Sequence, residues 1–162
     1  ESREICFVPD NDYASFIEKR VGEKNFYEGD IVNTEGEVLG RHRGYPAFTI
    51  GQRKGLNVGG LKEPHYVTAI DPEKNEITVG LKNSLYRSDF FVNKVNWYLP
   101  RQEVFEAQVQ IRYLHNGSAA KVKPLPDERA YVEFFEPQLS ITPGQSAVFY
   151  MDDCIIGGGW IE

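Results

Sequence analysis

Apolar side chains near the start of the chain recur at the spacing of one helical face. These residues are Tyr13, Phe16, Ile17 and Val21. Asp10 or Asn11 can cap the beginning of such a helix, and Gly22 lies where a left-handed C-cap is typical. The pattern therefore predicts a short helix whose aromatic and aliphatic stripe packs against a core.

Beyond this helix, apolar residues fall into short runs that are separated by turn-forming residues. Residues 31–34 and 37–39 flank a Glu-Gly turn at Gly36, which predicts a first hairpin. Residues 65–70 and 76–79 flank an Asp-Pro-Glu-Lys-Asn run, which predicts a second hairpin.

From residue 104 onward, apolar and polar residues alternate strictly, as in a strand with one buried face. The apolar set is Phe105, Ala107, Val109, Ile111 and Tyr113, and the polar set is Glu106, Gln108, Gln110 and Arg112. Further strands are expected at 119–122, 130–135, 146–150 and 154–156. Short antiparallel strands in this number predict a small barrel, because closure removes exposed strand edges.

Two features close to the end of the chain bear on this barrel. Cys154 lies in an apolar run and is expected in the core. Gly157-Gly158-Gly159 follows a predicted strand with no helix after it to hold a phosphate. We therefore interpret the glycines as a bulge or a close backbone approach.

The predicted fold class is mainly β with one or a few short helices: a small α+β domain followed by an antiparallel β-barrel. The chain has 162 residues, enough for one ordinary domain or two small ones, and we expect the boundary within 86–89. No run approaches the roughly 18 apolar residues that a membrane helix needs, so no membrane partner is expected. Only two cysteines, far apart, favour the reducing cytoplasm over a disulfide framework.

Charge is distributed unevenly along the sequence. The net charge of −6 argues against a nucleic-acid partner, yet residues 38–62 contain five bases and no acid, and residues 107–123 contain three bases and no acid. Such islands could form a local phosphate-binding face, since phosphate contacts need only local positive charge. Chance clustering on a solvated surface is the alternative.

Few motifs point to catalysis by themselves. There is no phosphate loop, no adenosylmethionine-binding or dinucleotide motif, and no cysteine pair at zinc spacing. The three histidines are distant in sequence, so no metal site is evident. The glycine-rich segment around Gln52, Arg53 and Lys54 is either a phosphate-binding loop or a flexible basic loop. Cys6, in an apolar tetrapeptide, is on local features either a small core residue or a reactive thiol.

Long strings of the sequence identify a family. They are Ile5-Cys6-Phe7, Thr49-Ile50-Gly51-Gln52-Arg53-Lys54-Gly55-Leu56, Ile111-Arg112-Tyr113 and Thr142-Pro143-Gly144-Gln145-Ser146-Ala147-Val148-Phe149-Tyr150, in that order. Over essentially its whole length the chain resembles the C-terminal half of the bacterial tRNA-specific 2-thiouridylase, a sulfurtransferase acting on the wobble uridine.

The resemblance implies a division of labour within a larger enzyme. It implies that residues 1–11 are the tail of a catalytic domain carrying Cys6, that 12–86 form a central domain, and that 87–162 form a translation-factor-like barrel. ATP binds to a pyrophosphatase domain in this family, and neither its phosphate loop nor the first catalytic cysteine occurs in this sequence. The chain alone is therefore expected to be inactive and to bind no cofactor.

The resemblance also assigns roles to single residues. Cys6 matches the cysteine that carries sulfur as a persulfide, received from a sulfur-relay donor protein. Arg112, Tyr113 and Gln145 match tRNA-binding positions, and Gln52, Arg53 and Lys54 are candidates for contact with RNA or with another domain. The alternative is a stand-alone RNA-binding, translation-factor-like module in which Cys6 is only a core residue.

Overall fold

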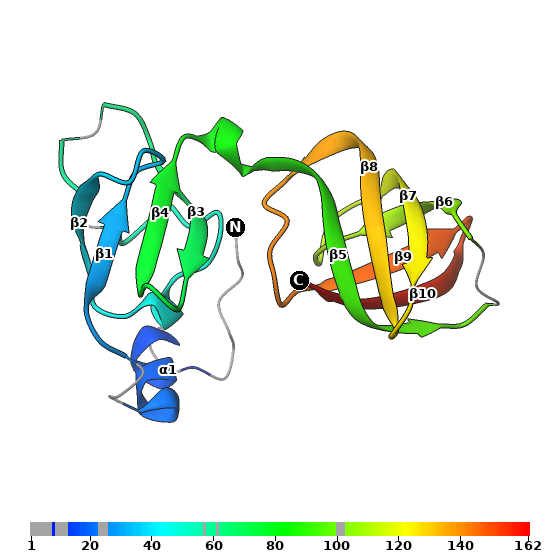
Figure 1. Cartoon of the computed structure of the whole chain (residues 1–162), viewed down its shortest axis with the longest axis horizontal. Coiled ribbons are helices and arrows are strands. Elements are labelled where there is room, and N and C mark those ends of the chain that lie inside the picture. The colour runs from blue at the N-terminus through cyan, green and yellow to red at the C-terminus, as the bar shows by residue number, and fades with distance from the viewer. Residues whose placement is uncertain (1–7, 9–12, 23–25, 57, 61, 100–102) are drawn as a thin grey trace. The chain divides into compact units, whose positions relative to one another are not determined.

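A computed structural model describes residues 8, 13–22, 26–56, 58–60, 62–99 and 103–162 of the chain. The chain divides into two compact units between Ser84 and Leu85, and each unit has its own sheet and core. Figure 1 shows the first unit in blue to green and the second in green to red.

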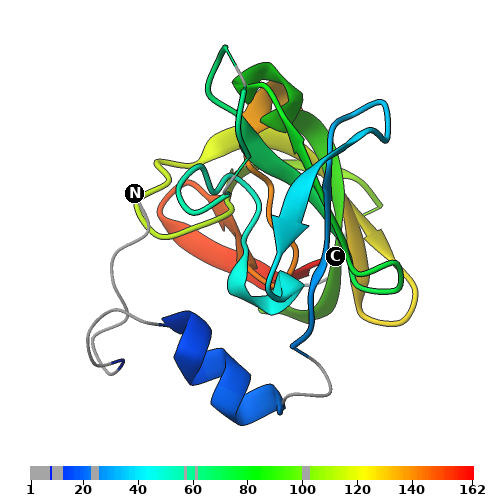
Figure 2. The same ribbon diagram turned by 90° about the vertical axis from the view of Figure 1, so that its left-hand side faces the viewer.

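The predicted helix is present as α1 (Tyr13–Val21). Gly22 ends it with φ 77°, and its N–H donates to the carbonyl of Glu18 at 3.0 Å, which confirms the predicted C-cap. The predicted N-caps, Asp10 and Asn11, lie outside the described residues. Phe16 is half-buried with the Arg20 guanidinium over its ring, and α1 lies against a 3-10 turn, η3 (Tyr45–Ala47) (Figure 2).

The first unit contains a four-stranded sheet in the order β2-β1-β4-β3. Its strands are β1 (Gly29–Val32), β2 (Val38–His42), β3 (Tyr66–Asp71) and β4 (Glu76–Gly80). Both predicted hairpins are confirmed, and the centre of the sheet pairs β1 with β4 in parallel. One face covers a core of Ile31, Leu56, Val67, Ile77 and Val79.

The second unit is a closed barrel in the strand order β10-β5-β8-β7-β6-β9. Its strands are β5 (Tyr86–Trp97), β6 (Phe105–Gln110), β7 (Ser118–Leu125), β8 (Arg129–Leu139), β9 (Ser146–Met151) and β10 (Cys154–Ile161). Every pairing is antiparallel, so the predicted barrel is confirmed. Strand β5, which the apolar pattern did not single out, contributes Phe90, Val92 and Val95 to the core.

The glycine run in β10 lies where backbones approach closely, as predicted. A side chain at Gly157 would meet the Trp97 ring at 2.8 Å, and one at Gly159 would overlap the Asn93 carbonyl. The register of β10 shifts near both glycines, against β9 between Ile155 and Gly157 and against β5 between Gly158 and Trp160. The bulged glycines therefore let β10 close the barrel.

The expectation that Cys154 belongs to the core is wrong. Cys154 is an exposed free cysteine, and Ile155 is also exposed, whereas Ile156 is buried. Cys154 pairs with Met151 across the tight β9–β10 turn, so the hairpin tip extends past the packed interior. An apolar run in sequence indicates a strand, but it does not show where that strand leaves the core.

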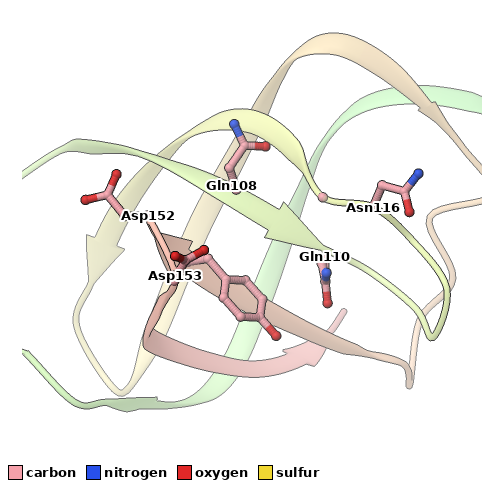
Figure 3. Close-up of a pocket in the computed structure, with 7 residues that line it drawn as sticks. Gln108, Gln110, Asn116, Asp152 and Asp153 are labelled. Atoms are coloured by element: carbon pink, nitrogen blue, oxygen red, sulfur yellow. The ribbon is translucent and has the colours of Figure 1, made fainter.

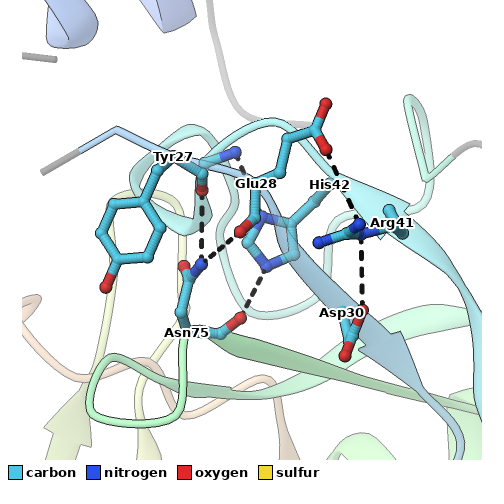
Figure 4. Close-up of polar contacts among 7 residues, drawn as sticks. Tyr27, Glu28, Asp30, Arg41, His42 and Asn75 are labelled. Carbon is cyan, nitrogen blue, oxygen red and sulfur yellow. Dashed lines mark hydrogen bonds and ion pairs between the residues drawn. The ribbon is translucent and has the colours of Figure 1, made fainter. Parts of the chain in front are cut away.

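A buried polar cluster holds the sheet of the first unit to its second hairpin turn (Figure 4). His42 Nε2 donates to the Asn75 carbonyl at 3.1 Å, while the Gly44 N–H donates to His42 Nδ1 at 3.1 Å. The Asn75 side-chain amide donates to the carbonyls of Glu28 and Tyr27 at 2.8 and 3.3 Å. This arrangement requires a neutral imidazole with its proton on Nε2.

We expect Gly29→Ala to destabilise the first unit, because the added methyl group would overlap Asn75 and lie 2.7 Å from His42 Nε2. Overpacking of this kind costs about 1–3 kcal/mol or more. The free energy of unfolding can be measured by urea titration with NMR signals from β1 and β4. Gly59→Ala is the control, since nothing lies within 4 Å of its added methyl group. Equal stability of the two variants would contradict the packing argument.

We expect the stability of the first unit to fall as pH decreases below about 6.5, the ordinary histidine pKa. Burial lowers the pKa of His42; the Asn75 hydrogen bond and Asp30 act in the opposite direction, and Arg41 adds to the lowering. The folded state therefore binds the proton less readily than the unfolded chain, and its stability is lost as pH falls. Thermal unfolding between pH 7.5 and 5 tests this. A flatter pH dependence in His42→Gln would support it, and an unchanged slope would contradict it.

Candidate nucleic-acid interface

The three residues predicted to bind tRNA lie at one end of the barrel. The register pairs Gln110, the last residue of β6, with Val148 near the start of β9. The chain therefore leaves β6 and enters β9 at the same end. Arg112 and Tyr113 follow β6 after a single residue, Ile111, and Gln145 directly precedes β9. All three residues are exposed.

Residues 111–117, which we name the 111–117 segment, connect β6 to β7 and are braced against the end of β8. Arg112 Nη1 donates to the Leu139 carbonyl at 2.8 Å, and His115 Nε2 lies 3.1 Å from Gln138 Oε1. Within the segment, the His115 N–H donates to the Arg112 carbonyl at 3.2 Å. A guanidinium has five N–H donors, so the Leu139 contact orients Arg112 and leaves other donors for a phosphate.

The position of Tyr113 differs from the sequence prediction. Alternation placed it on the buried face of a strand that continued to residue 113, but β6 ends at Gln110. Ile111 is still buried, and the chain then turns so that Tyr113 is 82% exposed. The alternation of apolar and polar residues continues past the end of β6. It does not indicate burial there, because alternation separates a buried from an exposed face only within a strand.

Gln145 is held by its backbone and exposes its side chain. Its N–H lies 3.3 Å from the Thr142 carbonyl, in a turn where Gly144 has φ 83°. Its carbonyl accepts from the Ile161 N–H at 2.8 Å, and the Gly144 N–H donates to the Ile161 carbonyl at 2.9 Å. The end of β10 therefore fixes this turn, and the Gln145 amide is available to a ligand.

The predicted loop residues Gln52, Arg53 and Lys54 belong to the first unit. The Gln52 side chain is used within its own loop: Oε1 accepts from the Thr49 N–H at 3.1 Å and Nε2 donates to the Lys54 carbonyl at 3.0 Å. Its backbone pairs with Val67 in β3. Arg53 and Lys54 are exposed on the loop that Gln52 shapes. The loop therefore presents two cations from an ordered backbone.

Sequence reasoning missed a polar pocket of about 310 Å³ on the wall of the barrel (Figure 3). Its lining is Gln108, Gln110, Asn116, Gly117, Tyr150, Asp152 and Asp153. The only sign of this pocket in the sequence is the polar face of the alternating strand, which includes Gln108 and Gln110. The two aspartates make this pocket poorly suited to a phosphate, in contrast to the neighbouring end of the barrel with Arg112.

Three further features remain to be placed: the predicted sulfur carrier, a possible metal site and a possible membrane-spanning helix. Cys6, the predicted sulfur carrier, lies outside the described residues. Among the residues that the structure describes, no three His, Cys, Asp or Glu side chains gather where they could share a metal ion. Within the same ranges, no helix has the length and apolar character to cross a membrane.

Comparisons with known proteins match both units. Residues 14–81 match the family described as tRNA methyl transferase PRC-barrel domain, and residues 87–161 match the aminomethyltransferase beta-barrel domain. The division between these matches falls in the same region as the division between the two compact units.

Curated relatives match this chain over essentially its full length. A tRNA-specific 2-thiouridylase of Syntrophus aciditrophicus (strain SB) is 45% identical over 100% of this chain and 53% of its own length. Those of Geotalea uraniireducens (strain Rf4) and Chlorobium phaeobacteroides (strain BS1) are each 47% identical, over 100% and 99% of this chain and 43% and 46% of their own lengths. The chain thus spans about half the length of the curated relatives it matches. With this identity over both units, the chain belongs to the tRNA-specific 2-thiouridylase family.

Proposed function

We propose that this chain is the tRNA-holding and sulfur-carrying part of an enzyme that makes 2-thiouridine at the wobble position of tRNA. The observation that carries the proposal is the barrel end with Arg112, Tyr113 and Gln145, which are exposed and held by ordered backbone. A cation, an aromatic ring and an amide together suit phosphate contact, base stacking and base-edge hydrogen bonding. The names of the relatives support tRNA as the substrate.

Cys6 is the proposed sulfur carrier. It would receive sulfur from a donor protein as a persulfide, whose terminal sulfur is a softer and more acidic nucleophile than a thiol. That sulfur would attack C2 of the uridine, and the C2 oxygen, once activated with ATP, would leave as part of AMP. The first cysteine of the family, which does not occur in this sequence, would then attack Sγ of Cys6. A disulfide would form between the two cysteines, the bond from Cys6 to the transferred sulfur would break, and that sulfur would stay on C2; the alternative is that the first cysteine assists the transfer.

In this scheme, ATP bound elsewhere in the enzyme would activate the uridine oxygen as a leaving group. The sequence contains no phosphate loop, so no residue of this chain is proposed to hold ATP. We propose that the chain by itself binds tRNA without thiolating it.

We expect Arg112→Gln to weaken tRNA binding about tenfold and to reduce the salt dependence by about one phosphate contact. The measurement is the tRNA dissociation constant of the 162-residue chain at several salt concentrations. Lys123→Gln removes the same charge from an exposed position toward the end of β7, away from Arg112, and should have a smaller effect. Equal losses in both variants would indicate unspecific attraction and would contradict a site at Arg112.

We expect Cys6→Ser in the full-length protein to abolish thiouridine formation, because a hydroxyl group cannot carry a persulfide. The measurement is the 2-thiouridine content of tRNA, by mass spectrometry, in cells whose own gene has been deleted and replaced. Cys154→Ser is the control, since that thiol is exposed at a hairpin tip. Normal thiouridine in the Cys6→Ser strain would favour an RNA-binding module in which Cys6 is structural.

A further inference from the structure

The 111–117 segment carries two apolar side chains that nothing in the barrel covers. Tyr113 is 82% exposed and Leu114 is 73% exposed, the highest values among the large hydrophobic residues that the structure describes. We name this pair the Tyr113–Leu114 tip. Single exposed apolar residues are common on protein surfaces, but two adjacent ones at a loop end form a projecting apolar feature.

Leu114 is also strained. Its φ of 66° lies in the left-handed region, where a leucine side chain crowds its own backbone and where Gly or Asn is usual. The fold therefore keeps an unfavourable residue at this turn, in a position where the side chain gains little burial. Strain of this kind is often found where a residue acts on a ligand.

The base of the tip is ordered and carries positive charge. Ile111 is 1% exposed, so it anchors the segment in the barrel core. Arg112 and His115, on either side of the tip, contact Leu139 and Gln138 at the end of β8. The tip therefore projects from a braced support, and Arg112 places a guanidinium beside it.

We propose that the Tyr113–Leu114 tip is a wedge for unstacked RNA bases, in which Tyr113 stacks on one base and Leu114 enters the adjoining base step. Apolar wedges separate stacked bases in other nucleic-acid complexes, and aromatic rings stack on bases of any sequence. Arg112 would hold the phosphate next to the separated step. This inference rests on the proposed function and adds a physical role for Leu114, which no motif singled out.

RNA is the favoured occupant because of what surrounds the tip. Arg112 retains free N–H donors and Gln145 exposes an amide at the same barrel end, so phosphate and base edges would both find partners. A purely apolar protein partner would leave these polar groups unused. Binding of a protein at the tip is the competing possibility.

The test is Leu114→Asn in the 162-residue chain, with an unmodified tRNA transcript carrying a wobble uridine as the probe. Asparagine tolerates the left-handed conformation and is polar, so thermal stability should stay equal or rise. We expect tRNA affinity to fall about fivefold to tenfold, since an apolar wedge is lost. Tyr113→Phe should bind normally, and Tyr113→Ala should bind at least about fivefold more weakly, because stacking is lost.

A second measurement distinguishes insertion of Leu114 into a base step from contact with the RNA surface alone. Chemical probing of the tRNA backbone should show locally raised reactivity in the wild-type complex, where a base step is opened, and Leu114→Asn should remove that signal. Ile155→Asn is the matched control: Ile155 is 49% exposed at a hairpin tip on the other end of the barrel, so affinity and probing pattern should not change.

The outcomes distinguish this inference from the proposed function. If the wild-type chain does not bind tRNA, the proposed function fails. If it binds, and Arg112→Gln weakens binding while Leu114→Asn is stable and binds and probes like the wild type, then tRNA binding stands and the wedge is wrong. In that case the tip contacts a protein or only completes a turn. If Leu114→Asn does not fold, Tyr113→Ala with its Tyr113→Phe control decides the same question.

Discussion

Closure of the barrel by β10 is the constraint on which the arrangement of the second unit depends. This strand pairs with β5 on one side and β9 on the other, and it can do so only because Gly157 and Gly159 have no side chains. Closure also removes the free edges that an open sheet of these strands would expose. A side chain at Gly157 would collide with the Trp97 ring, and one at Gly159 with the Asn93 backbone. Closure of the barrel and packing of its core therefore depend on the same glycines.

Closure of the barrel decides which residues meet at each of its ends. Because neighbouring strands are antiparallel, the segment after β6, the turn before β9 and the end of β10 meet at one end of the barrel. Arg112 and Gln145 therefore come together although 32 intervening residues separate them in sequence. The opposite end carries the β9–β10 turn with Asp152 and Asp153, which disfavours phosphate. The barrel thus carries the residues of the proposed RNA contact at one end and two carboxylates at the other.

The first unit also depends on a glycine at a place where two backbones approach closely. Gly29 allows β1 to lie against the Asn75 turn, and His42 and Asn75 then satisfy buried backbone groups across the gap. Removal of one hydrogen-bond partner from this cluster, or protonation of the imidazole, would leave buried polar groups unsatisfied and lower the stability. The loop with Arg53 and Lys54 is fixed by a comparable device, the Gln52 side chain. In both units, ordered polar contacts position the exposed cations.

The sequence by itself determined the helix, the hairpins and the barrel class, because periodicity and turn residues act locally. It could not find β5, where Lys94 in a left-handed conformation breaks the alternation between Val92 and Val95, nor could it show that Cys154 and Tyr113 leave the core. Resemblance, not periodicity, supplied Arg112, Tyr113 and Gln145 as candidates. Only the tertiary structure decided that these residues share one barrel end, and that Leu114 is strained and exposed beside them, because strand pairing and closure are long-range contacts that no local pattern encodes.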